Sequence, residues 1–185
     1  MLKEVVNFTA APIDNGKFTE ECRKKLEQEG VVTLHNFLKP ETIKELVQEA
    51  KSHSGLAYFT NSTHNVYLTT RNETLSPEHV FNRQLTSSKG CITTDQIPDA
   101  SKLKQLYCSD IFKKFICKVV NETALYEYAD PLSSINVHYA AEGQELNWHF
   151  DNSKFAITLL LQAPKSGGYF EYVSNLRNAE KNEMN

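Results

Sequence analysis

The stretch Trp148-His149-Phe150-Asp151 is followed by Thr158-Leu159-Leu160-Leu161-Gln162 and then by Gly167-Gly168-Tyr169-Phe170-Glu171-Tyr172-Val173. A histidine and an aspartate thus stand two residues apart, ahead of an apolar segment, a glycine turn and a second apolar segment. Side chains alternate between the two faces of an extended chain, so His149 and Asp151 are predicted to share one face. An imidazole and a carboxylate are two of the three ligands in the 2-His-1-carboxylate triad that binds non-haem Fe(II).

The third ligand of such a triad is a distal histidine, and the sequence has no histidine after His149. A His-x-Asp pair alone is weak evidence, because such pairs also arise by chance. The alternative interpretation is a polar strand end, with Asp151 as a turn residue that caps it.

Length and composition favour one folded domain over residues 1–185, because 40% of the 185 residues are apolar. The net charge is −3 and the chain has no basic cluster, which argues against a nucleic-acid partner. The N-terminus lacks the apolar core of a signal peptide, and no apolar run is long enough to cross a bilayer. We therefore expect a cytoplasmic protein without a membrane partner.

Periodicity predicts helices first and strands later, which is typical of an α+β domain. A helical part is expected over residues 18–130, with a first helix that starts after Thr19 and ends at Gly30. A second helix is expected to begin at Pro40. Two later helices are expected over residues 99–107 and 110–120, the second of them capped by Ser109. Residues 1–17, before the first helix, are expected to form an extended lead-in.

Strands are expected mainly over residues 133–173, followed by a polar tail over 174–185. Alternating or continuous apolar residues place these strands at 134–140, 148–150, 155–162 and 169–173. Shorter strands are expected at 31–34, 66–69 and 91–93 within the part that is otherwise helices and loops.

The quoted motifs, with Ala163-Pro164-Lys165-Ser166 and Asn175-Leu176-Arg177, resemble those of the Fe(II)/2-oxoglutarate-dependent amino-acid halogenase and hydroxylase family. That family includes enzymes that act on free lysine-like amino acids. The likeness extends upstream through Asp95-Gln96-Ile97-Pro98 and Tyr128-Ala129-Asp130-Pro131-Leu132. It implies N-terminal helices that buttress a double-stranded β-helix, the jelly-roll or cupin-like barrel, of which this chain would hold an incomplete form without the last strands.

The resemblance implies that His149 and Asp151 are iron ligands, with Fe(II) as cofactor, 2-oxoglutarate as cosubstrate and O2 as oxidant. Halogenases of the family carry glycine at the position that matches Asp151, so that chloride occupies that coordination position. A retained carboxylate fills it, and the expected parent reaction is therefore hydroxylation of a free amino acid or similar small molecule.

Two further residues are candidates for the site. Tyr139 lies on the strand before the motif, where related oxygenases often place a tyrosine that hydrogen-bonds 2-oxoglutarate. Core packing is the alternative for Tyr139, since a one-residue shift in register turns its ring to the other face. Arg83 is a candidate for binding a substrate carboxylate, and a solvated surface arginine is the alternative.

The sequence departs from the family pattern after residue 173. The distal histidine and the arginine that binds 2-oxoglutarate do not follow, and Arg177 comes too early to be that arginine. We therefore expect a truncated chain of low or no activity, with an open sheet edge through which it could self-associate. A non-catalytic binding or regulatory module, and a prolyl or lysyl side-chain hydroxylase, are the alternatives.

Overall fold

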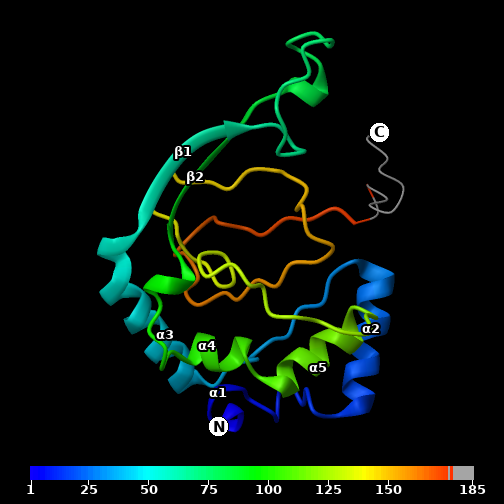
Figure 1. Cartoon of the computed structure of the whole chain (residues 1–185), viewed down its shortest axis with the longest axis vertical. Helices are drawn as coiled ribbons and strands as arrows, with labels where there is room; N and C mark the ends of the chain where they lie inside the picture. The colour runs from blue at the N-terminus through cyan, green and yellow to red at the C-terminus, as the bar shows by residue number, and fades with distance from the viewer. Residues whose placement is uncertain (175, 177–185) are drawn as a thin grey trace.

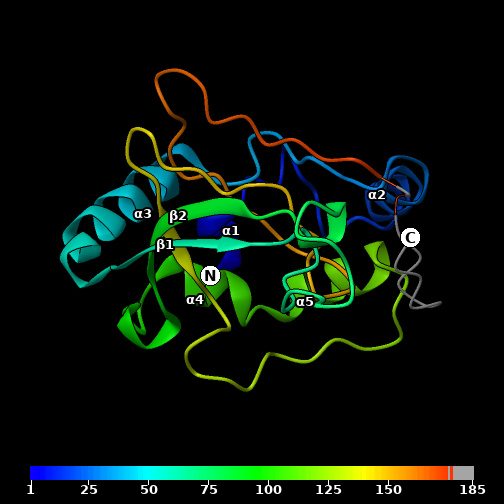
Figure 2. The same cartoon turned by 90° about the horizontal axis from the view of Figure 1, so that it is seen from above.

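The computed structural model describes residues 1–174 and 176. Helices gather at one end of the molecule, and a long β-hairpin rises from them toward the other end (Figure 1). Helices α3 and α2 lie on opposite sides of the molecule in both views (Figures 1 and 2). The elements are α1 (Leu2–Val5), α2 (Gly16–Glu29), α3 (Pro40–His53), η1 (Ser54–Leu56), β1 (Tyr58–His64), η2 (Val80–Asn82), β2 (Leu85–Ile92), η3 (Thr94–Gln96), α4 (Lys102–Tyr107), α5 (Asp110–Val119) and β3 (Val137–Tyr139).

Most predicted helix boundaries are confirmed. Helix α2 ends where Gly30 takes a left-handed conformation with φ 76°, α3 begins with Pro40, and the Ser109 side chain accepts a hydrogen bond from the Phe112 amide to start α5. The predicted start of α2 at Thr19 is wrong. Asn15 caps the helix, and its side chain accepts from the amides of residues 17 and 18, because its carbonyl oxygen reaches these free donors one turn earlier.

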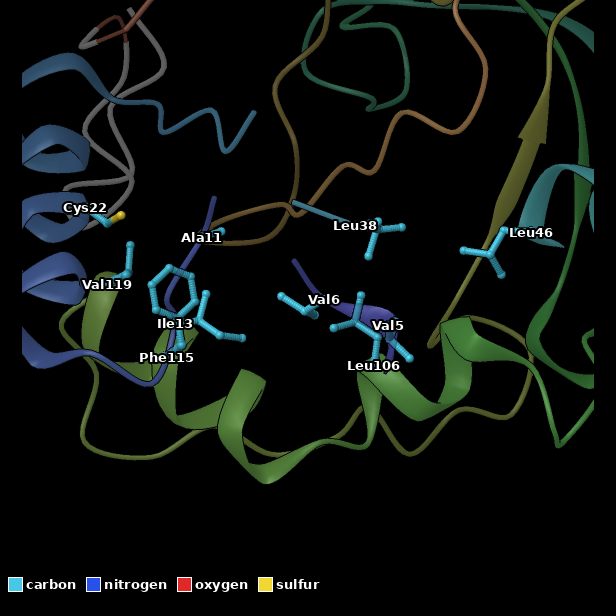
Figure 3. Packing of buried hydrophobic residues seen from close by; sticks show 10 residues of the cluster. All are labelled: Val5, Val6, Ala11, Ile13, Cys22, Leu38, Leu46, Leu106, Phe115 and Val119. Carbon is cyan, nitrogen blue, oxygen red and sulfur yellow. The ribbon is translucent and has the colours of Figure 1, made fainter. Parts of the chain in front are cut away.

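The core lies between the helices and includes the N-terminal segment (Figure 3). Phe18 of α2 stacks on Phe115 of α5 with ring centroids 6.1 Å apart. The extended lead-in predicted for 1–17 is wrong in part, because α1 forms there and Val5 and Val6 are completely buried. Val6 forms an isolated β-bridge with Leu38. This segment folds because its apolar side chains find cover on α4 and α3, which no local pattern shows.

A three-stranded antiparallel sheet has the order β1-β2-β3. Strands β1 and β2 pair from Tyr58 opposite Cys91 to His64 opposite Leu85. Phe59 pairs with Gly90, and a Cβ at Gly90 would lie 2.6 Å from the Phe59 ring, so a larger residue there would displace this exposed ring. The strand predicted at 66–69 is wrong, and the one at 91–93 is the end of the longer β2. The hairpin is not predicted from the sequence, because its strands are rich in Ser, Thr and Asn.

Few of the later predicted strands occur in the structure. Only Val137–Tyr139 of the segment 134–140 is paired, and the structure assigns no strand to 31–34, 148–150, 155–162 or 169–173. Leu159 and Leu161 pack on the core, while Leu160 is 70% exposed. Apolar residues alone do not make a strand, because a ladder also needs a neighbouring strand that pairs with its backbone.

The fold is therefore mixed helix and sheet, with one small sheet in the described part of the chain. The double-stranded β-helix stays a prediction for this protein. The predicted polar tail over 174–185 lies outside the described residues apart from positions 174 and 176. None of the helices in the described part is both long and apolar enough to cross a membrane.

Candidate functional site

His149 and Asp151 lie in the segment after β3, and their side chains meet as their spacing predicted. The Nε2 atom of His149 is 3.5 Å from Oδ1 of Asp151. The histidine side chain is 23% exposed and the aspartate side chain 58% exposed. The pair thus stands at the surface, with the imidazole mostly covered and the carboxylate open to solvent.

The orientation of the His149 ring is set by the backbone. Its Nδ1 atom lies 2.7 Å from the carbonyl oxygen of Asn147, which can only accept, so Nδ1 carries the hydrogen and donates it. In the neutral ring the lone pair is then on Nε2 and faces the Asp151 carboxylate. The two atoms, 3.5 Å apart, are electron-pair donors of the kinds that bind a metal cation.

The donor set suits Fe(II), because imidazole nitrogen and carboxylate oxygen are its ligands in facial-triad sites. Two ligands in adjacent positions of an octahedral ion, each about 2.1 Å from it, lie about 3 Å apart. The observed 3.5 Å is close to that separation. Within residues 1–174, however, no group of three or more His, Cys, Asp or Glu side chains is arranged to hold a metal ion.

An aromatic stack positions the motif against the loop after β1. The Tyr67 ring stacks on the Phe150 ring, with centroids 5.4 Å apart, and on the Phe81 ring, with centroids 5.1 Å apart. The Phe150 amide also donates to the carbonyl of Val66 at 2.7 Å. Phe150 is thus covered by the Tyr67 ring, whereas Trp148 is 46% exposed.

His64, at the end of β1, lies beside His149, with ring centroids 5.9 Å apart and planes at 83°. Its Nδ1 atom is 3.0 Å from the carbonyl oxygen of Asn65, an arrangement like that of His149. Sequence reasoning found no partner for His64 and did not single out Tyr67. No local signal could reveal the contact of His64 with His149 or that of Tyr67 with Phe150, because the partners in each pair lie more than 80 residues apart in the sequence.

Two buried asparagines shape the loops beside this pair of histidines. Asn65 is completely buried and accepts hydrogen bonds from the amides of Tyr67 and Thr69. Asn82 is 3% exposed, accepts from the Asn72 amide and donates to carbonyl groups of the same loop. Each side chain thus replaces the pairing that a strand would give to these backbone groups.

A cavity of about 670 Å³ opens between these loops. Arg83, the predicted substrate residue, lines it together with His64 and Arg71, so the structure brings Arg83 close to a neighbour of His149. The full lining consists of Thr63, His64, Leu68, Thr69, Thr70, Arg71, Pro77, Asn82, Arg83 and Gln84.

Tyr139 is bound to a helix in this structure. Its hydroxyl donates to the carbonyl of Ala50 in α3 at 2.7 Å, and burial raises the pKa of the phenol above its ordinary value. This contact matches the packing alternative for Tyr139. Its contact with 2-oxoglutarate stays a prediction.

Comparisons with known proteins identify the family. The family model described as HalD, halogenase D, matches residues 14–184. A search of curated proteins and a search of solved structures each gave no significant match. Because the family match covers His149, Asp151 and nearly the whole sequence, this chain belongs to the halogenase D family.

Proposed function

We propose that this protein is an Fe(II)/2-oxoglutarate-dependent oxygenase that hydroxylates a small molecule, with a free amino acid as the substrate class. The observation that carries the proposal is the pair of His149 Nε2 and Asp151 Oδ1, 3.5 Å apart. The carbonyl of Asn147 fixes the imidazole tautomer so that Nε2 faces the carboxylate. Membership of the halogenase D family adds support for an oxidative, iron-dependent enzyme.

His149 and Asp151 would hold the iron, and bound Fe(II) would activate O2 with 2-oxoglutarate as cosubstrate. The hydrogen bond from Nδ1 to the carbonyl of Asn147 keeps the ring in place, as outer contacts do at other metal sites. The aromatic stack around Tyr67 holds Phe150, between the two ligands, against the loop. These contacts hold the His149 ring and the backbone between the two ligands before a metal binds.

Hydroxylation is favoured over halogenation because Asp151 is a carboxylate. In the family resemblance described above, halogenases have glycine at this position and chloride fills the place of the carboxylate. The Oδ1 atom of Asp151 faces Nε2 of His149 and can itself serve as the anionic ligand, so chloride is not needed in that position. Iron binding by the natural chain is therefore expected to be independent of chloride, and binding by Asp151→Gly to depend on it.

The test is an anaerobic titration of Fe(II) into the chain with 2-oxoglutarate, followed by the visible charge-transfer band of the ternary complex. A saturable band that disappears in His149→Ala and in Asp151→Ala supports the proposal. His35→Ala and Asp14→Ala are matched controls, because both residues are exposed and lie on the helical side of the chain. A band that survives both ligand substitutions contradicts the assignment.

A non-catalytic binding module is the second candidate function. It is favoured by the finding that the described residues offer no third protein ligand beside His149 and Asp151. A folded sample that shows no band at any Fe(II) concentration, and whose thermal unfolding is unchanged by Fe(II), would support this alternative over the oxygenase.

A further inference from the structure

Strand β1 is an open edge of the sheet. The strand order is β1-β2-β3, so only one side of β1 is paired. In an antiparallel ladder, about half of the residues of an edge strand turn their N–H and C=O groups away from the neighbouring strand. Apart from the ladder with β2, no backbone hydrogen bond joins residues 58–64 to the rest of the described chain. Figure 1 shows β1 on the outer side of the hairpin.

The features that normally protect an edge strand are missing from β1. Such edges are blocked by charged side chains, by proline, by a bulge or by being very short. Residues 52–70 contain no Lys, Arg, Asp, Glu or Pro. The pairing with β2 runs through seven consecutive residues without a bulge, whereas β3, at the other edge of the described sheet, has three residues. Strand β1 is therefore the edge better suited to accept another strand.

The edge of β1 is also accessible to solvent. Thr60 and His64 are half-buried, and the other five residues of the strand are exposed. Side chains alternate between the two faces of a strand, so exposed residues lie on both faces of β1. Two of them are large aromatic residues, since Tyr58 is 76% exposed and Phe59 is 53% exposed. An added strand would meet no side chain of the core that it has to displace.

The sequence of β1 is complementary to itself in antiparallel pairing. A two-fold axis at Asn61 pairs all seven residues, whereas an axis at Thr60 or Ser62 leaves two residues of each strand unpaired. The pairs formed about Asn61 are Tyr58 with His64, Phe59 with Thr63, Thr60 with Ser62, and Asn61 with itself. Hydroxyl pairs and pairs of an aromatic with a β-branched residue stabilise sheets, and two amide groups can donate to each other. None of these pairs brings like charges together.

We propose that β1 pairs with β1 of a second copy of this chain, in a two-fold dimer whose sheet joins the three strands of each copy. The dimer goes beyond the proposed function and does not depend on iron. One pair of seven-residue strands is a small interface, so the dissociation constant is expected to be about micromolar or weaker. Pairing places Tyr58 of the second copy opposite His64, whose ring contacts His149.

The test is sedimentation velocity of the full chain at concentrations from about 1 µM to about 1 mM. Asn61→Lys sets two ammonium groups opposite each other at the axis and should weaken the dimer about tenfold or more, because like charges at this distance repel. Gln28→Lys is the matched control, since it adds the same charge at an exposed position of α2 and should leave dimerisation unchanged. Far-UV circular dichroism checks that both variants are folded.

A second variant, Asn61→Asp, tests the position of the axis. By itself it should weaken the dimer as Asn61→Lys does, because two carboxylates then face each other. An equal mixture of the Asn61→Lys and Asn61→Asp chains should form a dimer tighter than either variant alone, because opposite charges then meet at the axis.

A concentration-dependent dimer that both Asn61 variants weaken, and that their mixture restores, supports the proposal. Four results overturn it: a chain that stays monomeric up to about 1 mM, a dimer that Asn61→Lys leaves intact, an equal loss in Gln28→Lys, or a mixture that pairs no better than either variant alone. A dimer that Asn61→Lys leaves intact would indicate contact through another surface, such as the exposed apolar residues after β3.

Discussion

The helical part of the molecule and the segment after β3 differ in how their apolar side chains are covered. Every member of the buried core cluster lies between residues 5 and 119, on or beside the helices. Large apolar residues of the later segment are instead exposed: Ile157, Leu160, Tyr169, Phe170, Tyr172 and Val173. A helix satisfies its backbone locally and needs only one covered face, whereas a strand needs a partner for its backbone as well.

The largest expected effect compares one phenylalanine from each region. Phe115→Ala should lower the free energy of unfolding by about 3–5 kcal/mol, because it empties a buried site against Phe18. Phe170→Ala should change it by less than about 0.5 kcal/mol, because Phe170 is 75% exposed. Urea unfolding followed by far-UV circular dichroism measures both. An equal loss of unfolding free energy in the two variants would contradict the comparison, because it would show that Phe170 is as well buried in solution as Phe115.

A smaller effect is expected in the loop between β1 and β2, which packs beside the segment after β3. Asn82→Ala should cost about 1–3 kcal/mol, since it leaves the Asn72 amide and nearby carbonyls without their partner. Hydrogen exchange of the Asn72 amide should accelerate while exchange in α5 stays slow. Asn61→Ala, at an exposed position of β1, is the control and should change neither quantity. Unchanged exchange at Asn72 in Asn82→Ala would contradict the role given to this side chain.

The smallest effect concerns the contact of β3 with α3. Tyr139→Phe should cost about 0.5–1.5 kcal/mol near neutral pH, because it removes the hydrogen bond to Ala50. Burial raises the pKa of Tyr139 above 10.0, so the phenol ionises first in the unfolded chain. Its stabilising contribution is complete below pH 10 and is lost as pH rises through the folded pKa.

Unfolding curves of the natural chain and of Tyr139→Phe should therefore converge above pH 10. Tyr58→Phe is the control, since Tyr58 is 76% exposed on β1. A difference between the natural chain and Tyr139→Phe that persists unchanged at high pH would show that the hydroxyl does not carry the contact.

Local chemistry predicted the helices because their signals lie within a few residues of each boundary. Gly30, Pro40 and Ser109 stand where the structure ends or begins a helix. The hairpin of β1 and β2 escaped prediction because its strands carry polar side chains on a small sheet, so apolar alternation is absent. The burial of Val5 and Val6 also depends on distant partners, Leu38 among them.

For the candidate site, the sequence by itself determined the pair of His149 and Asp151, because a spacing of two residues brings two side chains together on one face of an extended segment. Only the tertiary structure decided what stands around that pair. The hairpin places His64 against His149 and gathers Arg71 and Arg83 on one cavity. These contacts join residues far apart in the chain, and their energies come from packing and charge that no short stretch of sequence contains.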